Sequence, residues 1–311
     1  MHQAHSARTC LASSHADVGQ RANAARLQHS RASVSQSVKA LPHTPWLKTG
    51  NWFRFKLLSD ERIWGAATNG FTRVTAEPRR RFLLRADMAD QLQIDMFRGG
   101  NHPGQLSQFV GRETLKTVTL KDGENALIRT YRHGGVFRWI TGKTFFSWPP
   151  RPFRELVITE ELRRRGVPTV EVYGAGVEGI FGPFYRGWLI TRELKDSYDL
   201  WTALQNGFVR KWTVEKVFRS VASSLRAMHQ EGIYHSDLNL KNILVKAEPA
   251  GVKAYVIDFD KAVLFVGGLP EPLAEKNLRR LLRSVSKLDR QRQYVPAAEW
   301  DKLVTWYHEA G

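Results

Sequence analysis

The sequence has a single cysteine, Cys10, and no long apolar run. One cysteine excludes an intramolecular disulfide framework and any zinc site built from several thiolates, and it favours a reducing compartment. Because Arg, Lys or Gly interrupts every apolar stretch, none approaches the roughly 20 residues that a membrane-spanning helix needs. We therefore expect a protein that is soluble or that lies on a membrane surface.

Acidic residues are also few. The chain has 30 Asp and Glu against 47 Lys and Arg, a formal net charge of +17. This charge attracts anionic partners such as nucleic acid, acidic lipid or a phosphorylated substrate, and it does not choose among them. Hydrophobic residues make up 42% of the chain and aromatic residues 11%, which is enough for a real core and excludes a mostly disordered protein.

The chain up to about Ser59 shows no lasting apolar period. It is rich in Ala, Ser, His, Gln and Arg, and Asp17 is its only acidic residue. Arg and Ser enrichment with few acids is also typical of a transit peptide. We favour a disordered or mis-started extension over residues 1–88, with the basic run at 77–81 as a solvated linker. A chain that starts at Met88 is then expected to keep full activity.

Regular patterns begin near residue 90. Residues 114–120 alternate with a period of two, 121–124 (K-D-G-E) carry the Asp-Gly turn signal, and 125–131 resume as a strand, which predicts a β-hairpin. The other predicted elements are strands before residue 195 around one helix, and mainly helices after it. They are helices at 153–165, 214–231, 273–288 and 297–308, and strands at 170–173, 187–194, 243–245 and 254–257.

Two segments carry the chemistry. Residues 234–245 (Y-H-S-D-L-N-L-K-N-I-L-V) contain H-x-D-x-x-x-x-N, and residues 255–261 (Y-V-I-D-F-D-K) follow after a short hairpin. Phosphoryl transfer to an alcohol needs a carboxylate that accepts the hydroxyl proton and oxygen ligands that hold Mg²⁺ against the phosphates of ATP. The spacing predicts Asp237 as the catalytic base and Asn242 and Asp258 as the metal ligands.

The alternative for each of these three residues is a structural carboxylate or a turn-capping asparagine, and it requires several coincidences at once. For His235 we expect a structural role, through hydrogen bonds within the loop near Asp258.

The first half of the chain should then bind the nucleotide. Kinases usually pair a strand lysine with a helical glutamate, and here the strand A-L-I-R offers Arg129 and the next helix offers Glu155. The planar fork of arginine can bind phosphates, although it departs from the usual lysine. Arg132 competes with Arg129, and Glu160 and Glu161 compete with Glu155.

Two further nucleotide contacts are predicted. Gly111, in F-V-G-R-E-T, is a candidate for the loop that covers the phosphates, with Gly99 and Gly100 as the alternative. Glu193 and Leu194 end the stretch W-L-I-T-R-E-L, where a hinge would present backbone groups to adenine. An ordinary strand end is the alternative there.

Together these motifs resemble the lipopolysaccharide kinase family, in particular its bacterial 3-deoxy-D-manno-octulosonic acid (Kdo) kinases. The resemblance runs from about residue 105 to 288, and a basic helix follows I-D-F-D where ordinary protein kinases have a long activation segment with A-P-E. The motifs that carry it are R-T-Y-R-H-G-G at Arg129, F-R-E-L and E-E-L-R-R-R-G-V-P from Phe153, H-S-D-L-N-L-K-N-I-L-V, I-D-F-D-K, and N-L-R-R-L-L-R-S-V-S-K-L from Asn277.

The resemblance implies an α+β, two-lobed protein-kinase-like fold. Its small, mainly β N-lobe is expected at 89–194 and its mainly helical C-lobe, with the catalytic loop, at 195–311. It also implies ATP and Mg²⁺ dependence, a Kdo hydroxyl on a lipid A precursor as the acceptor, and peripheral attachment to the cytoplasmic face of the bacterial inner membrane. Arg129 and the long extension depart from the family's pattern.

Other functions stay open at this point. A protein Ser/Thr kinase is disfavoured by the missing activation segment and by Asn239 in place of the catalytic-loop lysine; another small-molecule kinase and a basic pseudokinase module remain. The aromatic and basic stretch at 136–154 and the basic helix at 273–288 suit an anionic membrane surface, with an inter-lobe core and a solvated face as the alternatives. We expect no nucleic-acid partner, and steeply salt-dependent binding to duplex DNA would revive one.

Overall fold

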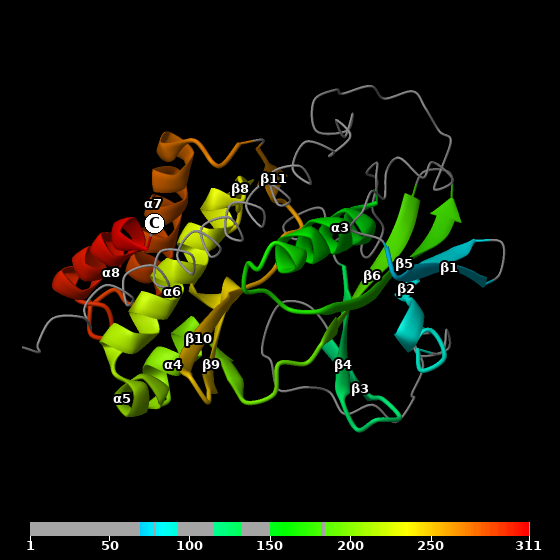
Figure 1. Cartoon of the computed structure of the whole chain (residues 1–311), viewed down its shortest axis with the longest axis horizontal. Helices are drawn as coiled ribbons and strands as arrows, with labels where there is room; N and C mark the ends of the chain where they lie inside the picture. Colours follow the sequence, from blue (N-terminus) through cyan, green and yellow to red (C-terminus); the bar gives the residue numbers. More distant parts are fainter. Residues whose placement is uncertain are drawn as a thin grey trace, which may run out of the picture. The chain divides into compact units, whose positions relative to one another are not determined.

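The computed structural model describes residues 69–76, 79–92, 115–131, 150–181, 184–265 and 267–310 (Figure 1). All of them belong to one compact unit, Ala66–Gly311, and the other unit, Met1–Gly65, lies outside the described residues. None of the helices in the described part combines the length and apolar character that a membrane crossing requires.

The first half of the unit is built on a six-stranded sheet with the order β1-β2-β5-β6-β4-β3. Every neighbouring pair is antiparallel. The predicted hairpin is present because Gly123 adopts a positive φ of 79° in the turn, and Asp122 accepts a hydrogen bond from the Glu124 N–H at 3.0 Å. The strands are β1 (Phe71–Ala76), β2 (Arg80–Arg85), β3 (Leu115–Thr119), β4 (Asn125–Thr130), β5 (Val172–Phe181) and β6 (Phe184–Arg192).

Strands β1 and β2 lie in the range that we predicted to be disordered. Phe82, Leu83 and Leu84 of β2 are only 2, 3 and 1% exposed, and β2 pairs along β5. Gly174 of β5 makes this packing possible, because a Cβ there would come within 2.7 Å of the Leu84 side chain. The prediction of a disordered extension and a basic linker is therefore wrong for residues 71–76 and 79–88.

Helix α3 (Arg151–Arg164) packs against β5 and β6 of the sheet (Figure 1). It starts after Pro150, with Pro152 in its first turn, where the missing N–H of proline costs no helical hydrogen bond. It ends before Gly166, whose φ of 83° stops the helix. Phe153, Leu156 and Leu162 of this helix are buried, but so are Glu155 and Glu160, so the helix is present without the one-sided apolar face that was predicted.

The second half is mainly helical around one apolar core. Helix α6 (Val214–Gln230) lies at its centre and contacts α8 and β10, with Val217, Val221 and Leu225 fully buried. Two small sheets, β10-β9-β7 and β11-β8, carry the loops of the site described below. The remaining elements are α4 (Leu200–Gln205), α5 (Phe208–Trp212), α7 (Glu271–Leu288), α8 (Ala297–Glu309), the short helices η4 (Ala86–Met88) and η6 (Leu240–Asn242), and β7 (Ser197–Asp199), β8 (Ile233–Tyr234), β9 (Ile243–Glu248), β10 (Gly251–Val256) and β11 (Val263–Leu264).

The sheet-rich first half and the helical second half confirm the predicted α+β fold class, with a mainly β N-lobe and a mainly helical C-lobe. Within the described residues, the predicted helices and strands are all present, and β5 and β6 are longer than expected. The first half starts earlier than residue 89, since β1 and β2 complete its sheet.

Candidate active site

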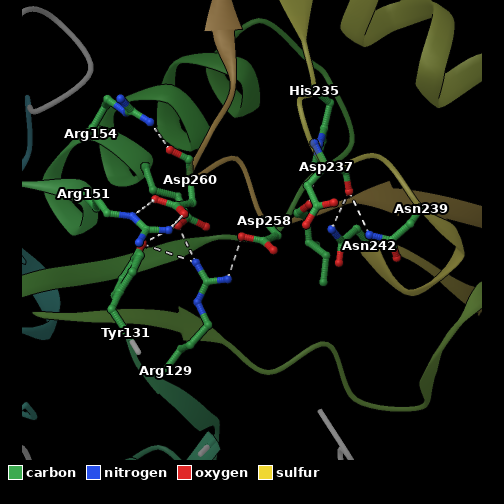
Figure 2. Close-up of polar contacts among 12 residues, drawn as sticks. Arg129, Tyr131, Arg151, Arg154, His235, Asp237, Asn239, Asn242, Asp258 and Asp260 are labelled. Atoms are coloured by element: carbon green, nitrogen blue, oxygen red, sulfur yellow. Dashed lines mark hydrogen bonds and ion pairs between the residues drawn. The ribbon is translucent and has the colours of Figure 1, made fainter. Parts of the chain in front are cut away.

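The loop that carries Asp237, residues 235–242, joins β8 to β9. Its shape comes from backbone groups of Asp237: the N–H donates to Nδ1 of His235 at 3.2 Å, and the carbonyl accepts from Nδ2 of Asn239 at 2.8 Å and Nδ2 of Asn242 at 2.9 Å. Figure 2 shows both amides directed at this one carbonyl. Asp237 itself is exposed, so its carboxylate is accessible to a substrate.

Asn242 is oriented by the same contact. Because its Nδ2 donates to the Asp237 carbonyl, the side-chain oxygen is left as an acceptor that could bind a cation. The Asn242 backbone carbonyl also accepts from the N–H of Ile257 at 3.0 Å, which attaches this loop to the residue before Asp258.

His235 provides a second link between the two segments. Its ring is buried, its Nδ1 accepts from the Asp237 N–H, and its Nε2 therefore carries the proton that is donated to the Ile257 carbonyl at 2.9 Å. Burial lowers the pKa of His235, against the backbone hydrogen bond and the charges of Asp258 and Asp237, which raise it. The neutral ring thus has the structural role that we expected, between Asp237 and the strand that leads to Asp258.

Helix α7 supports the loop from its other side. Asn277 is fully buried, and its Oδ1 accepts from the His235 N–H at 2.9 Å while its Nδ2 donates to the His235 carbonyl at 2.9 Å. Ser284, two turns on, accepts from the N–H of Leu240 at 3.2 Å. The first residue of the N-L-R-R motif therefore fixes the backbone two residues before Asp237, a role that the sequence analysis missed.

Asp258 follows β10 with a positive φ of 67°, which is uncommon for a residue other than glycine and typical of functional sites. Its Oδ1 accepts from Nη1 of Arg129 at 2.9 Å. Burial raises the pKa of Asp258, but the charge and hydrogen bond of Arg129 outweigh it, so the pKa lies below its usual value. The carboxylate is therefore ionised at neutral pH.

The donor set of Asn242 and Asp258 fits Mg²⁺. This ion takes oxygen ligands and usually needs only one or two carboxylates, because phosphate oxygens and water complete its shell. In the part of the chain that the structure describes, no cluster of three or more His, Cys, Asp or Glu side chains offers a self-sufficient metal site. A metal held here would thus depend on the nucleotide for its remaining ligands.

Arg129 of β4 meets Glu155 of α3, as the strand and helix patterns predicted. Nη2 of Arg129 and the hydroxyl of Tyr131 both donate to Oε2 of Glu155, which is only 2% exposed. Burial and the charge of Glu155 raise the pKa of Tyr131 well above its usual value, so the hydroxyl keeps its proton for this bond. The Arg129 guanidinium thus contacts both Glu155 and Asp258, and Figure 2 shows it directed at Asp258.

The two competing glutamates are occupied elsewhere. Glu160 pairs with Arg163 and accepts from the Val172 N–H at 3.0 Å, while Glu161 pairs with Arg165. The structure therefore brings Glu155, rather than either neighbour, to Arg129. Arg132, Gly111, Gly99 and Gly100 lie outside the described residues.

Glu193 and Leu194 connect β6 of the large sheet to β7 of the small one. The Glu193 N–H donates to the Asn125 carbonyl at 2.8 Å, and the Leu194 carbonyl accepts from the Ser197 hydroxyl at 2.6 Å. These two groups are already engaged. The Leu194 N–H donates to no carbonyl within the described ranges. Of the two backbone N–H groups, it is therefore the better candidate for a hydrogen bond with adenine.

Asp260, Arg151 and Arg154 form a group that the sequence analysis missed. Arg151 donates from Nε to Oδ1 of Asp260 at 2.7 Å and from Nη2 to Oδ2, and Arg154 donates to the Asp260 backbone carbonyl (Figure 2). Asp260 is 6% exposed. The sequence feature that could have predicted this group is the second aspartate of I-D-F-D, because a buried carboxylate in an apolar motif needs a cationic partner.

Comparison with known proteins decides the family. A model of the lipopolysaccharide kinase (Kdo/WaaP) family matches residues 105–307. The chain belongs to this family. One relative is the 3-deoxy-D-manno-octulosonic acid kinase of Pasteurella multocida (strain Pm70), which is 30% identical over 209 residues, or 65% of this chain and 84% of the relative. Another is the 3-deoxy-D-manno-octulosonic acid kinase of Vibrio cholerae serotype O1 (strain ATCC 39315 / El Tor Inaba N16961), which is 30% identical over 185 residues, or 58% of this chain and 74% of the relative.

Among solved structures, WaaP in complex with acyl carrier protein is similar to this chain with a TM-score of 0.44 at 18% identity, covering 66% of this chain and 78% of that chain. Family membership confirms the predicted resemblance and the class of enzyme, a phosphotransferase of lipopolysaccharide synthesis.

Proposed function

We propose that this lipopolysaccharide kinase transfers the γ-phosphoryl group of ATP to a hydroxyl of Kdo on a lipid A precursor. The observation that carries the proposal is the pair of links from the Asp237 loop to Ile257, through His235 Nε2 at 2.9 Å and through the Asn242 carbonyl at 3.0 Å. They hold an accessible carboxylate and an amide oxygen next to the segment that ends in Asp258. Kdo as the acceptor follows from the kinship with Kdo kinases.

In the reaction we propose, Asp237 orients the acceptor hydroxyl and accepts its proton. The hydroxyl oxygen forms a bond to the γ-phosphorus, the bond from that phosphorus to the β,γ-bridging oxygen breaks, and ADP leaves. Asn242 and Asp258 would hold Mg²⁺, which spreads the charge that develops on the phosphate oxygens.

The nucleotide would lie between the two halves of the unit. Glu155 fixes one arm of the Arg129 fork, and the other arm can exchange the Asp258 carboxylate for a phosphate oxygen. The Leu194 N–H and the Glu193 carbonyl are our candidates for contacts with adenine, and Gly111 for the phosphate-covering loop. These roles are those that the sequence pattern predicts.

We also propose that the enzyme works peripherally at the cytoplasmic face of the inner membrane, where its lipid-linked acceptor lies. Exposed Arg279, Arg283 and Lys287 on α7 support attraction to an anionic surface. Their contribution is weakened by the pairing of Arg279 with Glu275 at 3.0 Å.

A transfer assay tests the acceptor. With labelled ATP and Mg²⁺, we expect label on a lipid A precursor that carries Kdo, and none on the same precursor without Kdo, a generic protein substrate or an aminoglycoside. The two lipids differ only in the sugar, so the comparison isolates the proposed acceptor group from binding of the lipid. Label on the protein instead would favour a Ser/Thr kinase, and label on the Kdo-free precursor would move the acceptor to another hydroxyl.

A further inference from the structure

The buried carboxylate of Asp260 has no part in the reaction described above. It lies two residues after Asp258, and the bidentate bond from Arg151 satisfies both of its oxygens. A buried ion pair stabilises a fold no better than apolar side chains of similar volume, so its presence calls for another explanation.

The position of Arg151 and Arg154 on α3 suggests what the buried ion pair with Asp260 does. Both lie in the first turn, near the helix N-terminus, where the helix dipole disfavours cations, and this turn has no acidic residue. Burial and the charge of Arg151 lower the pKa of Arg154. Since these two arginines do not favour the N-terminal end of α3, we look for their role in the contacts that they make with Asp260.

These contacts join α3 to the 258–260 segment, the same two parts of the chain that Arg129 joins. Arg129 bridges Glu155 of α3 and Asp258, while Arg151 and Arg154 join the turn before Glu155 directly to Asp260 (Figure 2). Turning α3 away from Arg129 would therefore leave the Asp260 charge buried without a partner. The contacts with Asp260 therefore favour the position of α3 in which Glu155 binds Arg129.

Protein kinases control this arrangement with a phosphorylated activation segment, which positions the helix that bears the glutamate. Here only residues 261–270 separate Asp260 from α7, and β11 occupies part of them. We propose that Asp260 is a positioning residue that takes the place of the activation-segment phosphate: through Arg151 and Arg154 it holds α3 where Glu155 binds Arg129, so that the enzyme needs no phosphorylation to bind MgATP.

Nucleotide binding without any acceptor tests this inference, which rests on the proposed roles of Arg129 and Glu155. Isothermal titration with Mg²⁺ and a non-hydrolysable ATP analogue should give about a tenfold higher Kd for Asp260→Asn than for the wild type, as expected when about a tenth of the molecules hold α3 in place. The fitted stoichiometry should stay near one nucleotide per chain, because every folded molecule can reach the arrangement that binds. A loss of folded protein would lower the stoichiometry and leave Kd unchanged.

Two variants guard against misfolding and non-specific effects. The double variant Asp260→Asn/Arg151→Met removes both charges together, so it should remain folded and show the Kd of the single variant, because both lack the same link. Glu178→Gln breaks a partly buried pair with Arg80 in the β2–β5 region and should leave Kd within twofold.

The outcomes separate the inference from the proposed function. If the wild type fails to bind the analogue, the proposed function fails first. If the wild type binds and Asp260→Asn binds equally well, Asp260 does not position α3. Phosphatase treatment of the wild-type enzyme should leave its Kd unchanged; a weaker Kd after treatment would show that a covalent phosphate has this role instead.

Discussion

Asp237→Asn is expected to lower kcat for phosphoryl transfer by about a hundred- to ten-thousandfold, the range that a positioned general base contributes. Asparagine cannot accept the hydroxyl proton, although it is nearly the same size. The fold should tolerate the change, because the loop depends on the backbone groups of residue 237, which bind His235, Asn239 and Asn242. Steady-state rates together with thermal unfolding check both parts.

The matched control is Asp301→Asn, which makes the same substitution at an exposed carboxylate on α8. It should leave kcat within about twofold, as surface substitutions away from special contacts do little. If Asp237→Asn kept more than about a tenth of the wild-type kcat, the proton would have to go to another group. The proposed reaction would then lose its base, and Asp237 would become a residue of substrate binding.

The part of the site that could be predicted from the sequence is the part whose geometry is local. Asp237 and Asn242 lie in one loop, so their spacing alone predicts that they meet, and one hydrogen bond of 2.9 Å joins them. Arg129 and Glu155 lie on a predicted strand and a predicted helix, and the kinase pattern pairs a strand cation with a helical glutamate. Their contact is present, while their roles toward the nucleotide stay predictions.

The Asp260 group could not be predicted in the same way. Arg151 and Asp260 are 109 residues apart, and α3 offers four arginines to any distant carboxylate. Helical periodicity can tell which side of a helix is apolar, but a pairing between charged residues depends on how the sheet and the 258–260 segment pack around α3. The sequence signal, a second aspartate after I-D-F, indicates a need for a partner without identifying it.

Strands β1 and β2 were missed for a related reason. β2 pairs with β5, as Leu84 lies opposite Gly174, so its stability comes from residues 90 positions away. Its own residues begin with arginines, which resemble a solvated linker. In β5, Gly174 and Gly176 weaken the strand pattern, yet both leave room for side chains of β2: a Cβ on Gly176 would lie 2.2 Å from the Phe82 ring.

A chain that begins at Met88 is therefore expected to be inactive and insoluble, the reverse of the expectation from the sequence. The deletion removes Phe82, Leu83 and Leu84 from the core, and with them the ring of Phe82 stacked 6.2 Å from Trp188. Losing a buried Phe or Leu side chain costs about 2–5 kcal/mol, and three together rival the 5–15 kcal/mol that stabilises a typical domain. Soluble yield and thermal unfolding measure the effect.

The shortened chain would also expose β5 as a new sheet edge. Its unpaired backbone groups and the uncovered Tyr173 and Ala175 next to them would favour aggregation. A chain that begins at Ala66, the first residue of the compact unit, retains both strands and should unfold cooperatively. If the Met88 chain instead matched the Ala66 chain in yield and kcat, the sheet would be stable with β5 at its edge, and the packing of β2 would contribute far less than its burial indicates.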